Sequence, residues 1–219
     1  LIVHSSLRQP NKNFTLTDML ISHCPAIKKI GEDPSRPGIV HRLDKEVSGL
    51  MVVAKNEQSF DNLKKQFQQR TIVKEYIALA YGAINAISGS IDFPIKRSSR
   101  GYKMAALPLT KKGELSEEGK PAKTYFEIIK KFINYTLLKI IIKTGRTHQI
   151  RAHLAAYGHP LAGDNIYSTA KTRQLNNKLN LGRIFLTASC LAFTDLAGSR
   201  QKFQINLPDE LNKLLKNIK

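Results

Sequence analysis

The stretch HRLDKEVSGLMVVA, residues 41–54, places one aspartate among basic side chains and directly ahead of an apolar run. The run from Gly49 to Ala54 is short and rich in strand-forming residues, which predicts a strand buried on both faces. Asp44 would then be held rigidly at a sheet end. By spacing alone, an aspartate in this place is typical of a turn or a helix cap, so its chemistry stays open at this point.

The charge of the chain is strongly positive, because 35 Lys and Arg stand against 17 Asp and Glu and give +18 over 219 residues. This balance predicts a polyanionic partner, although a solvated basic surface is the alternative. Apolar runs are only strand-sized, and no basic amphipathic helix is visible, so we expect no membrane partner. Cys24 and Cys190 lack paired spacing, which argues against a zinc ribbon or a disulfide framework and favours the reducing cytoplasm.

Periodic apolar patterns around the opening stretch predict an α+β fold. The expected strands are 71–82, 123–132, 135–143, 184–193 and 201–206, and the expected helices follow Asn56, Thr147 and Pro208. Residues 88–118 are rich in Gly, Ser and Lys, which indicates loops and short strands. Since strands outnumber helices and several are joined as hairpins, we expect a central mixed, largely antiparallel sheet with peripheral helices.

Two of these elements carry polar residues in notable positions. In the strand 71–82, alternation puts Lys74 and Tyr76 on one face with small alanines, so that open space is expected above Tyr76. The helix after Thr147 should bury Ile150, Leu154 and Tyr157 and end at Gly158. His148 and Arg151 are three residues apart and should share its polar face.

Three motifs together resemble the RluA-like family of RNA pseudouridine synthases. The first is HRLD followed by Ser-Gly-Leu at 41–50, the second is Lys74-Glu75-Tyr76, and the third combines GRTHQIR at 145–151 with GHP at 158–160 and Gly163-Asp164. The opening LIVH at 1–4 also resembles the end of a conserved family strand. The resemblance implies one catalytic domain over 1–219, with its sheet split into two lobes around an active-site cleft.

The resemblance also implies a role for each motif residue. Asp44 corresponds to the nucleophile, which acts by covalent catalysis on a uridine flipped out of structured RNA. Arg151 corresponds to its charge partner, and such a pair about 4 Å apart attracts by roughly 4 kcal/mol at intermediate dielectric. Tyr76 corresponds to the aromatic beneath the uracil, and Arg42 to the side chain that displaces the base. Without the motifs, Tyr76 would be an ordinary strand tyrosine and Arg151 a phosphate contact on an exposed helix face.

Further RNA contacts are expected from motif residues and from a basic stretch. The motif residues are His41, Lys74, Arg146 and His148, and the stretch contributes Lys96, Arg97, Arg100, Lys103, Lys111 and Lys112. A solvated basic face is the alternative for the stretch. His148, His153 and His159 with Asp164 are spaced five and six residues apart, which does not suit a metal site, so Asp164 is expected to brace a loop. We expect no metal and no cofactor.

The chain departs from the family pattern in two places. Val47 stands where the family usually has threonine, so a hydroxyl that would support the Asp44 loop is missing. A first strand with a Lys-Pro pair and an N-terminal RNA-binding domain are not seen in this sequence.

The function implied is that of an RNA pseudouridine synthase, an isomerase that acts as a monomer, with ribosomal RNA favoured over transfer RNA as substrate. An RNA-binding ribosome-assembly factor of the same fold is the alternative. A nucleoside or glycoside hydrolase would normally need a second carboxylate.

Overall fold

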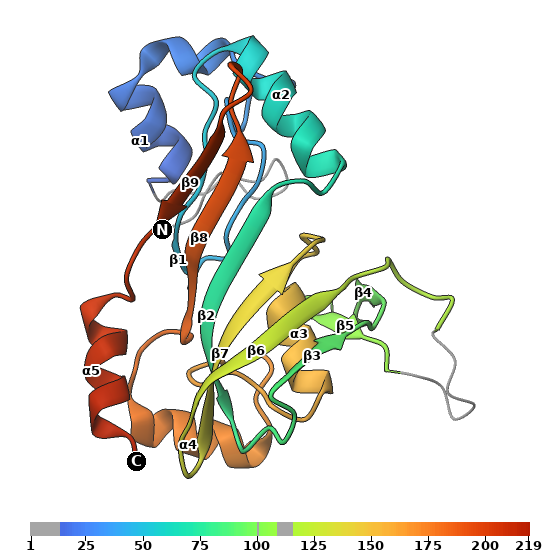
Figure 1. The fold of residues 1–219 in the computed structure, drawn as a ribbon, viewed down its shortest axis with the longest axis vertical. Coiled ribbons are helices and arrows are strands. Elements are labelled where there is room, and N and C mark those ends of the chain that lie inside the picture. Colours follow the sequence, from blue (N-terminus) through green and yellow to red (C-terminus); the bar gives the residue numbers. More distant parts are fainter. Residues whose placement is uncertain (1–13, 100, 109–115) are drawn as a thin grey trace. The chain divides into compact units, whose positions relative to one another are not determined.

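The computed structural model describes residues 14–99, 101–108 and 116–219 (Figure 1). The chain forms two compact units. Of the described residues, the first unit contains those up to Val73 together with Cys190–Gln204, and the second contains those within Lys74–Ser189 and Ile205–Lys219. Strand β8, Leu186–Thr194, has residues in both units. The opening LIVH lies outside the described residues.

The first unit combines short helices with short strands. It contains α1 (Leu16–His23), the short 3₁₀ helix η1 (Pro25–Lys29), β1 (Ser48–Gly49), α2 (Glu57–Gln68) and β9 (Arg200–Gln204), which pairs antiparallel with β8. The Asn56 side chain caps α2 by accepting from the Ser59 N–H at 2.8 Å. Phe60 and Leu63 of this helix pack on Leu191 of β8, and the helix expected after Asn56 is confirmed.

The second unit is built on antiparallel strands. They are β2 (Val73–Tyr81), β3 (Ser88–Ile91), β6 (Thr124–Lys131) and β7 (Tyr135–Ile142), with β4 (Ile95–Arg97) and β5 (Met104–Ala106) as a separate pair. The main sheet has the order β1-β8-β2-β7-β6-β3, and β9 pairs with β8. The predicted hairpins 123–143 and 184–206 are both present. The α+β class and the largely antiparallel sheet are therefore confirmed.

Helices cover both faces of the sheet within the second unit (Figure 1). They are α3 (Gln149–Ala156), α4 (Ala170–Leu179) and α5 (Asp209–Asn217). Phe126 of β6 meets Tyr157 at the end of α3, with ring centroids 5.7 Å apart. Leu211 of α5 packs with Leu79 and Leu137, whose parity along the strands puts them on the opposite face. No helix among the described residues is long and apolar enough to cross a membrane.

Two sequence predictions about these elements were wrong. Residues 49–54 are not a strand buried on both faces, because only Ser48–Gly49 is a strand and every residue from Gly49 to Val53 is half-buried. Tyr157 does not enter the core and is 38% exposed, since α3 ends one residue earlier. Tyr76 is more buried than expected, at 8% exposure.

Candidate functional site

The Asp44 segment of the first unit is a tight turn. The Val47 N–H donates to the Asp44 carbonyl at 3.0 Å, with Lys45 and Glu46 between them. Leu43 is buried and anchors the entry to the turn, and Asp44 itself is half-buried. Because a backbone bond closes this turn, the valine that replaces the family's threonine is compatible with its geometry.

His41 has a structural contact on the entry side of the same turn. Its Nε2 accepts from the Val52 N–H at 3.0 Å, and its ring stacks on Phe67 of α2 with centroids 4.8 Å apart. The His41 side chain thus connects residues 49–54 to α2 of the first unit. Because the Val52 N–H donates to His41, it is not available to pair with a neighbouring strand. Arg42, the next residue, is exposed.

In the second unit, Gln149 organises the turn of the third motif. Its Oε1 accepts from the Thr144 hydroxyl at 2.7 Å and from the Arg146 N–H at 3.1 Å. Its Nε2 donates to the Lys123 carbonyl at 3.0 Å and to the Thr124 hydroxyl at 3.1 Å. The buried amide therefore holds the start of α3 rigidly.

His148 precedes α3 in a left-handed conformation, with φ 54°. This conformation is uncommon for a residue with a side chain. The His148 Nδ1 lies 3.0 Å from the Tyr167 hydroxyl.

Arg151 is buried at the start of α3 and is bound by Asp164. Its Nε donates to Asp164 Oδ2 at 2.8 Å and its Nη2 to Oδ1 at 3.0 Å, a bidentate pair. The side chains are 3% and 0% exposed. Arg151 is therefore not a phosphate contact on an exposed helix face, but it lies on the same side as His148, as predicted, because both side chains contact Tyr167.

The pairing of Arg151 with Asp164 changes the electrostatics expected at this position. The pair is formally neutral, so the attraction of about 4 kcal/mol expected from an isolated guanidinium does not apply in full. A guanidinium carries five N–H donors, and Asp164 takes two of them. The approach of Arg151 to Asp44 joins residues of different units and stays a prediction.

Lys74 and Tyr76 lie on β2 of the second unit. Tyr76 pairs with Ile140 of β7, on the same face as Phe126. Burial, and after it the positive charge of Lys143, lower the pKa of Lys74 to about 8. A lysine with this pKa changes charge near neutral pH, which an exposed lysine does not do.

The remaining histidines of the third motif hold the fold. His153 is fully buried, with Nε2 donating to the Phe93 carbonyl and Nδ1 accepting from the Thr124 hydroxyl, both at 2.9 Å. Burial lowers its pKa and outweighs the opposing effects of the Phe93 bond and Asp92, so the ring is neutral. His159 Nδ1 donates to the Tyr81 carbonyl at 2.9 Å.

The basic residues of the 88–118 stretch form a partly ion-paired surface. Lys96 pairs with Glu118, and Arg97 donates to the Gly101 carbonyl at 2.8 Å. The Lys103 ammonium lies 5.7 Å from the Tyr102 ring centroid. Arg100, Lys111 and Lys112 lie outside the described residues. Arg146 of the third motif is half-buried, and its Nε donates to the Pro121 carbonyl at 3.3 Å.

Sequence reasoning missed the roles of Gln149, Asp164 and Tyr167. Asp164 was expected only to brace a loop, which it does through the N–H groups of Ile166 and Tyr167 at 2.9 and 3.0 Å. Its bidentate contact with Arg151 was not anticipated. An aspartate followed by Asn165-Ile166-Tyr167 is a recognisable Asx-turn signal, but nothing in the spacing indicates the arginine.

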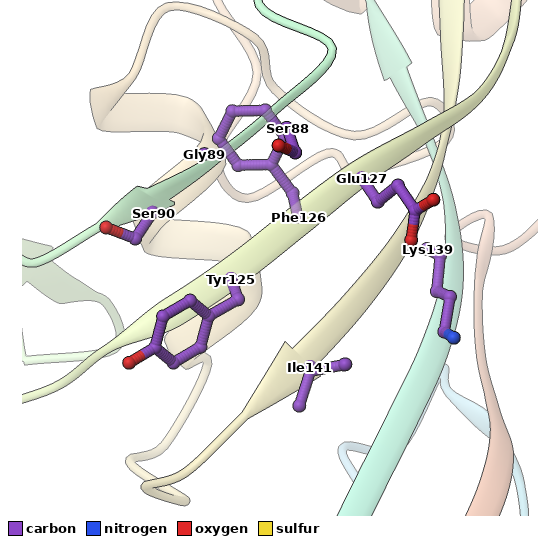
Figure 2. A pocket seen from close by; sticks show the side chains of 8 residues that line it. All are labelled: Ser88, Gly89, Ser90, Tyr125, Phe126, Glu127, Lys139 and Ile141. Carbon is purple, nitrogen blue, oxygen red and sulfur yellow. The ribbon is translucent and has the colours of Figure 1, made fainter.

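A hollow lies on the sheet of the second unit (Figure 2). Tyr125, Glu127, Lys139 and Ile141 point into it from β6 and β7. In the strand register these residues share a face with Glu75 and lie opposite Tyr76. The hollow is therefore not the place where the base is expected to bind.

Comparison with known proteins gives consistent matches. A model of the RNA pseudouridylate synthase family matches residues 23–156. An uncharacterized RNA pseudouridine synthase of Bacillus subtilis, YlyB, is 35% identical over 94% of this chain and 63% of its own length. The ribosomal large subunit pseudouridine synthase D of Nitrosomonas europaea is 37% identical over 100% of this chain and 60% of its own length.

A solved structure is also similar. Human RNA pseudouridylate synthase domain containing 1 is 26% identical, with a TM-score of 0.71 over 89% of this chain and 74% of the human chain. The chain spans less than two thirds of the length of the curated relatives named above, which it covers to 63% and 60%.

Proposed function

Because the chain belongs to the family of RNA pseudouridylate synthases, we propose that it isomerises uridine to pseudouridine within a structured RNA. The observation that carries the proposal is the family match over residues 23–156, which spans Asp44, Tyr76 and Arg151. The charge of +18 supports a polyanionic substrate.

The reaction breaks the bond between N1 of uracil and C1′ of the ribose, turns the base and forms a bond between C5 and C1′. C5 loses a proton and N1 gains one, so atoms and electrons balance without an added reagent. In the proposed mechanism the Asp44 carboxylate is the nucleophile that splits this exchange into two easier steps. The tight turn from Asp44 to Val47 supports the role, because it fixes the backbone that carries the carboxylate.

The other motif residues receive and position the base. We assign Tyr76 to stacking beneath the uracil, where about 1–3 kcal/mol per base recovers part of the flipping cost. Arg42 is assigned to the gap that the base leaves, and its exposure supports that role. Arg151 is assigned to Asp44 as an oriented hydrogen-bond donor rather than an isolated charge, since Asp164 already neutralises it. Lys74, Arg146, His148 and His41 are assigned to the RNA.

The substrate proposed is ribosomal RNA. Relatives named ribosomal large subunit pseudouridine synthase D occur in Nitrosomonas europaea and Haemophilus influenzae, with 37% and 36% identity over the full chain. A tight, salt-sensitive interaction with a large folded RNA also suits the basic composition. We further propose that 1–219 act as one catalytic domain, as a monomer, in the cytoplasm and without a metal or cofactor.

The test is conversion of uridine in total RNA by the purified chain, read as pseudouridine by mass spectrometry of nucleosides. Asp44→Asn should abolish conversion and leave RNA binding unchanged. Asp61→Asn removes the same charge from an exposed site on α2 and should keep full activity. Lack of conversion in any RNA by the wild-type chain, or full activity of Asp44→Asn, would refute the proposal. A pure assembly factor would keep its cellular role after Asp44→Ala.

A further inference from the structure

In the second unit, two side chains contact the buried Arg151 side chain from different sides. They are Asp164, which binds the edge of the guanidinium, and Tyr167, whose ring centroid lies 5.2 Å from the Arg151 Cζ. We propose that Asp164 and Tyr167 are positioning residues that together fix the orientation of the Arg151 guanidinium for the reaction. The inference rests on the proposed function and extends it to two residues beyond the 23–156 match.

Asp164 is itself held in place by several hydrogen bonds. Besides Arg151, its Oδ1 accepts from the N–H groups of Ile166 and Tyr167 at 2.9 and 3.0 Å. Its own carbonyl accepts from the Asn176 amide of α4 at 3.1 Å, and its side chain is fully buried. A carboxylate bound by this many donors cannot rotate if the Arg151 side chain moves. Asp164 therefore determines the orientation of the Arg151 guanidinium.

Tyr167 adds a restraint from the π face and connects the pair to its surroundings. Its hydroxyl accepts from the Met104 N–H at 2.9 Å and lies 3.0 Å from His148 Nδ1. The ring is therefore fixed at its far end, and a fixed ring limits tilting of the cation above it. Met104 begins β5, whose hairpin with β4 includes Arg97 in register with Met104. A contact of RNA with this hairpin would thus bear directly on the ring beside Arg151.

Burial of an ion pair is weak evidence for stabilisation, because desolvation offsets the attraction between the charges. The arrangement instead fixes the orientation of the Arg151 guanidinium. Because Asp164 accepts two N–H groups of the planar guanidinium, the other N–H groups of Arg151 point in fixed directions within that plane. Displacement of a catalytic group by about 1 Å can cost about 100-fold in rate, so a loosened guanidinium should slow turnover more than it weakens RNA binding.

The kinetic experiment compares Asp164→Asn and Tyr167→Phe with the wild-type chain on an RNA that it modifies. We expect kcat to fall about 100-fold for Asp164→Asn, with KM changed by less than about threefold. Tyr167→Phe removes only the hydroxyl, so it should fold and lower kcat by about tenfold. Tyr157→Phe, on the exposed end of α3, is the matched control and should keep wild-type kcat.

A double-mutant cycle separates positioning from general damage. If Asp164 acts through Arg151, adding Asp164→Asn to Arg151→Lys should cost less than about threefold, since the fork is already lost. Equal losses of kcat in both backgrounds would overturn the proposal. Should Asp164→Asn fail to fold, Tyr167→Phe carries the test, and unchanged kcat in that variant would overturn the role of Tyr167.

A second measurement does not depend on turnover. The Arg151 Nε–H signal in ¹⁵N NMR spectra should exchange slowly with solvent in the wild-type chain and at least tenfold faster in Asp164→Asn or Tyr167→Phe. Equally slow exchange in Tyr167→Phe would overturn the restraint by the ring. If the wild-type chain converts no uridine while these NMR results hold, the proposed function fails but the restraint on the guanidinium stands.

Discussion

Asn176 of α4 holds the loop that carries Asp164, and Asn176→Asp should show how strongly. Its Oδ1 accepts from the Tyr81 hydroxyl at 2.7 Å and from the Gly163 N–H at 2.8 Å. Its Nδ2 donates to the Asp164 carbonyl at 3.1 Å and to Asn165 Oδ1 at 3.2 Å. An aspartate at this position keeps the two bonds that Oδ1 accepts. Its second carboxyl oxygen, however, faces the Asp164 carbonyl oxygen and Asn165 Oδ1, so both donated bonds are lost.

The magnitude follows from this geometry. Asn176 is buried, and a buried carbonyl that loses its donor costs about 1–3 kcal/mol. Ionisation of the new carboxyl adds a further cost, so the free energy of unfolding should fall by about 2–4 kcal/mol at pH 8. Protonation restores one donor, and burial raises the pKa of the new carboxyl above about 4. The variant should therefore recover stability as the pH is lowered toward 5.

Urea unfolding at pH 5 and pH 8 measures the effect. Asn176→Ala is the matched control, because it loses all four bonds and has no titratable group, so its deficit should not depend on pH. The reasoning would be refuted if Asn176→Asp lowered the free energy of unfolding by the same amount at both pH values, or by less than about 0.5 kcal/mol at pH 8.

Three further predictions concern single residues. Because the pKa of Lys74 is about 8, RNA affinity should fall as the pH rises from 7 to 9, and Lys74→Arg should remove this dependence in a binding titration at constant salt. Gly163→Ala would put a Cβ 1.9 Å from the Arg183 carbonyl oxygen at φ +78°, so it should lower Tm more than Gly182→Ala, which has φ +71° and meets nothing. Burial lowers the pKa of His153, so below about pH 6.5 the unfolded chain binds a proton at this residue before the folded chain does. The free energy of unfolding should therefore decline as the pH falls below about 6.5, and this decline should be absent in His153→Gln.

Much of the fold follows from local patterns in the sequence. Alternation along 71–82 placed Lys74 and Tyr76 correctly on one strand face, as the pairing of Tyr76 with Ile140 confirms. The cap at Asn56 and the apolar spacing behind it located α2. Such features depend on neighbours in sequence, which a pattern can capture.

Features that depend on distant contacts were not predicted. Residues 49–54 have strand composition, but the Val52 N–H donates to the His41 side chain instead of to a strand. The pattern of apolar and polar residues does not indicate this contact. Asp164 binds Arg151 across a loop, and no helical or strand period connects them. The polar helix α4 was missed because its residues give a weak apolar pattern, although Thr169 and Thr172 form a capping box at its start.

The division of the chain into units has a consequence for synthesis on the ribosome. Leu191 of β8 closes the apolar cluster around Phe60, Leu63 and Ile72 in the unit that carries Asp44. At about 5–20 residues per second, Leu191 is translated several seconds or more after Ile72. The first unit to appear therefore cannot complete its core until Cys190–Gln204 are made, and during that interval its apolar helix face is open to chaperones or to aggregation.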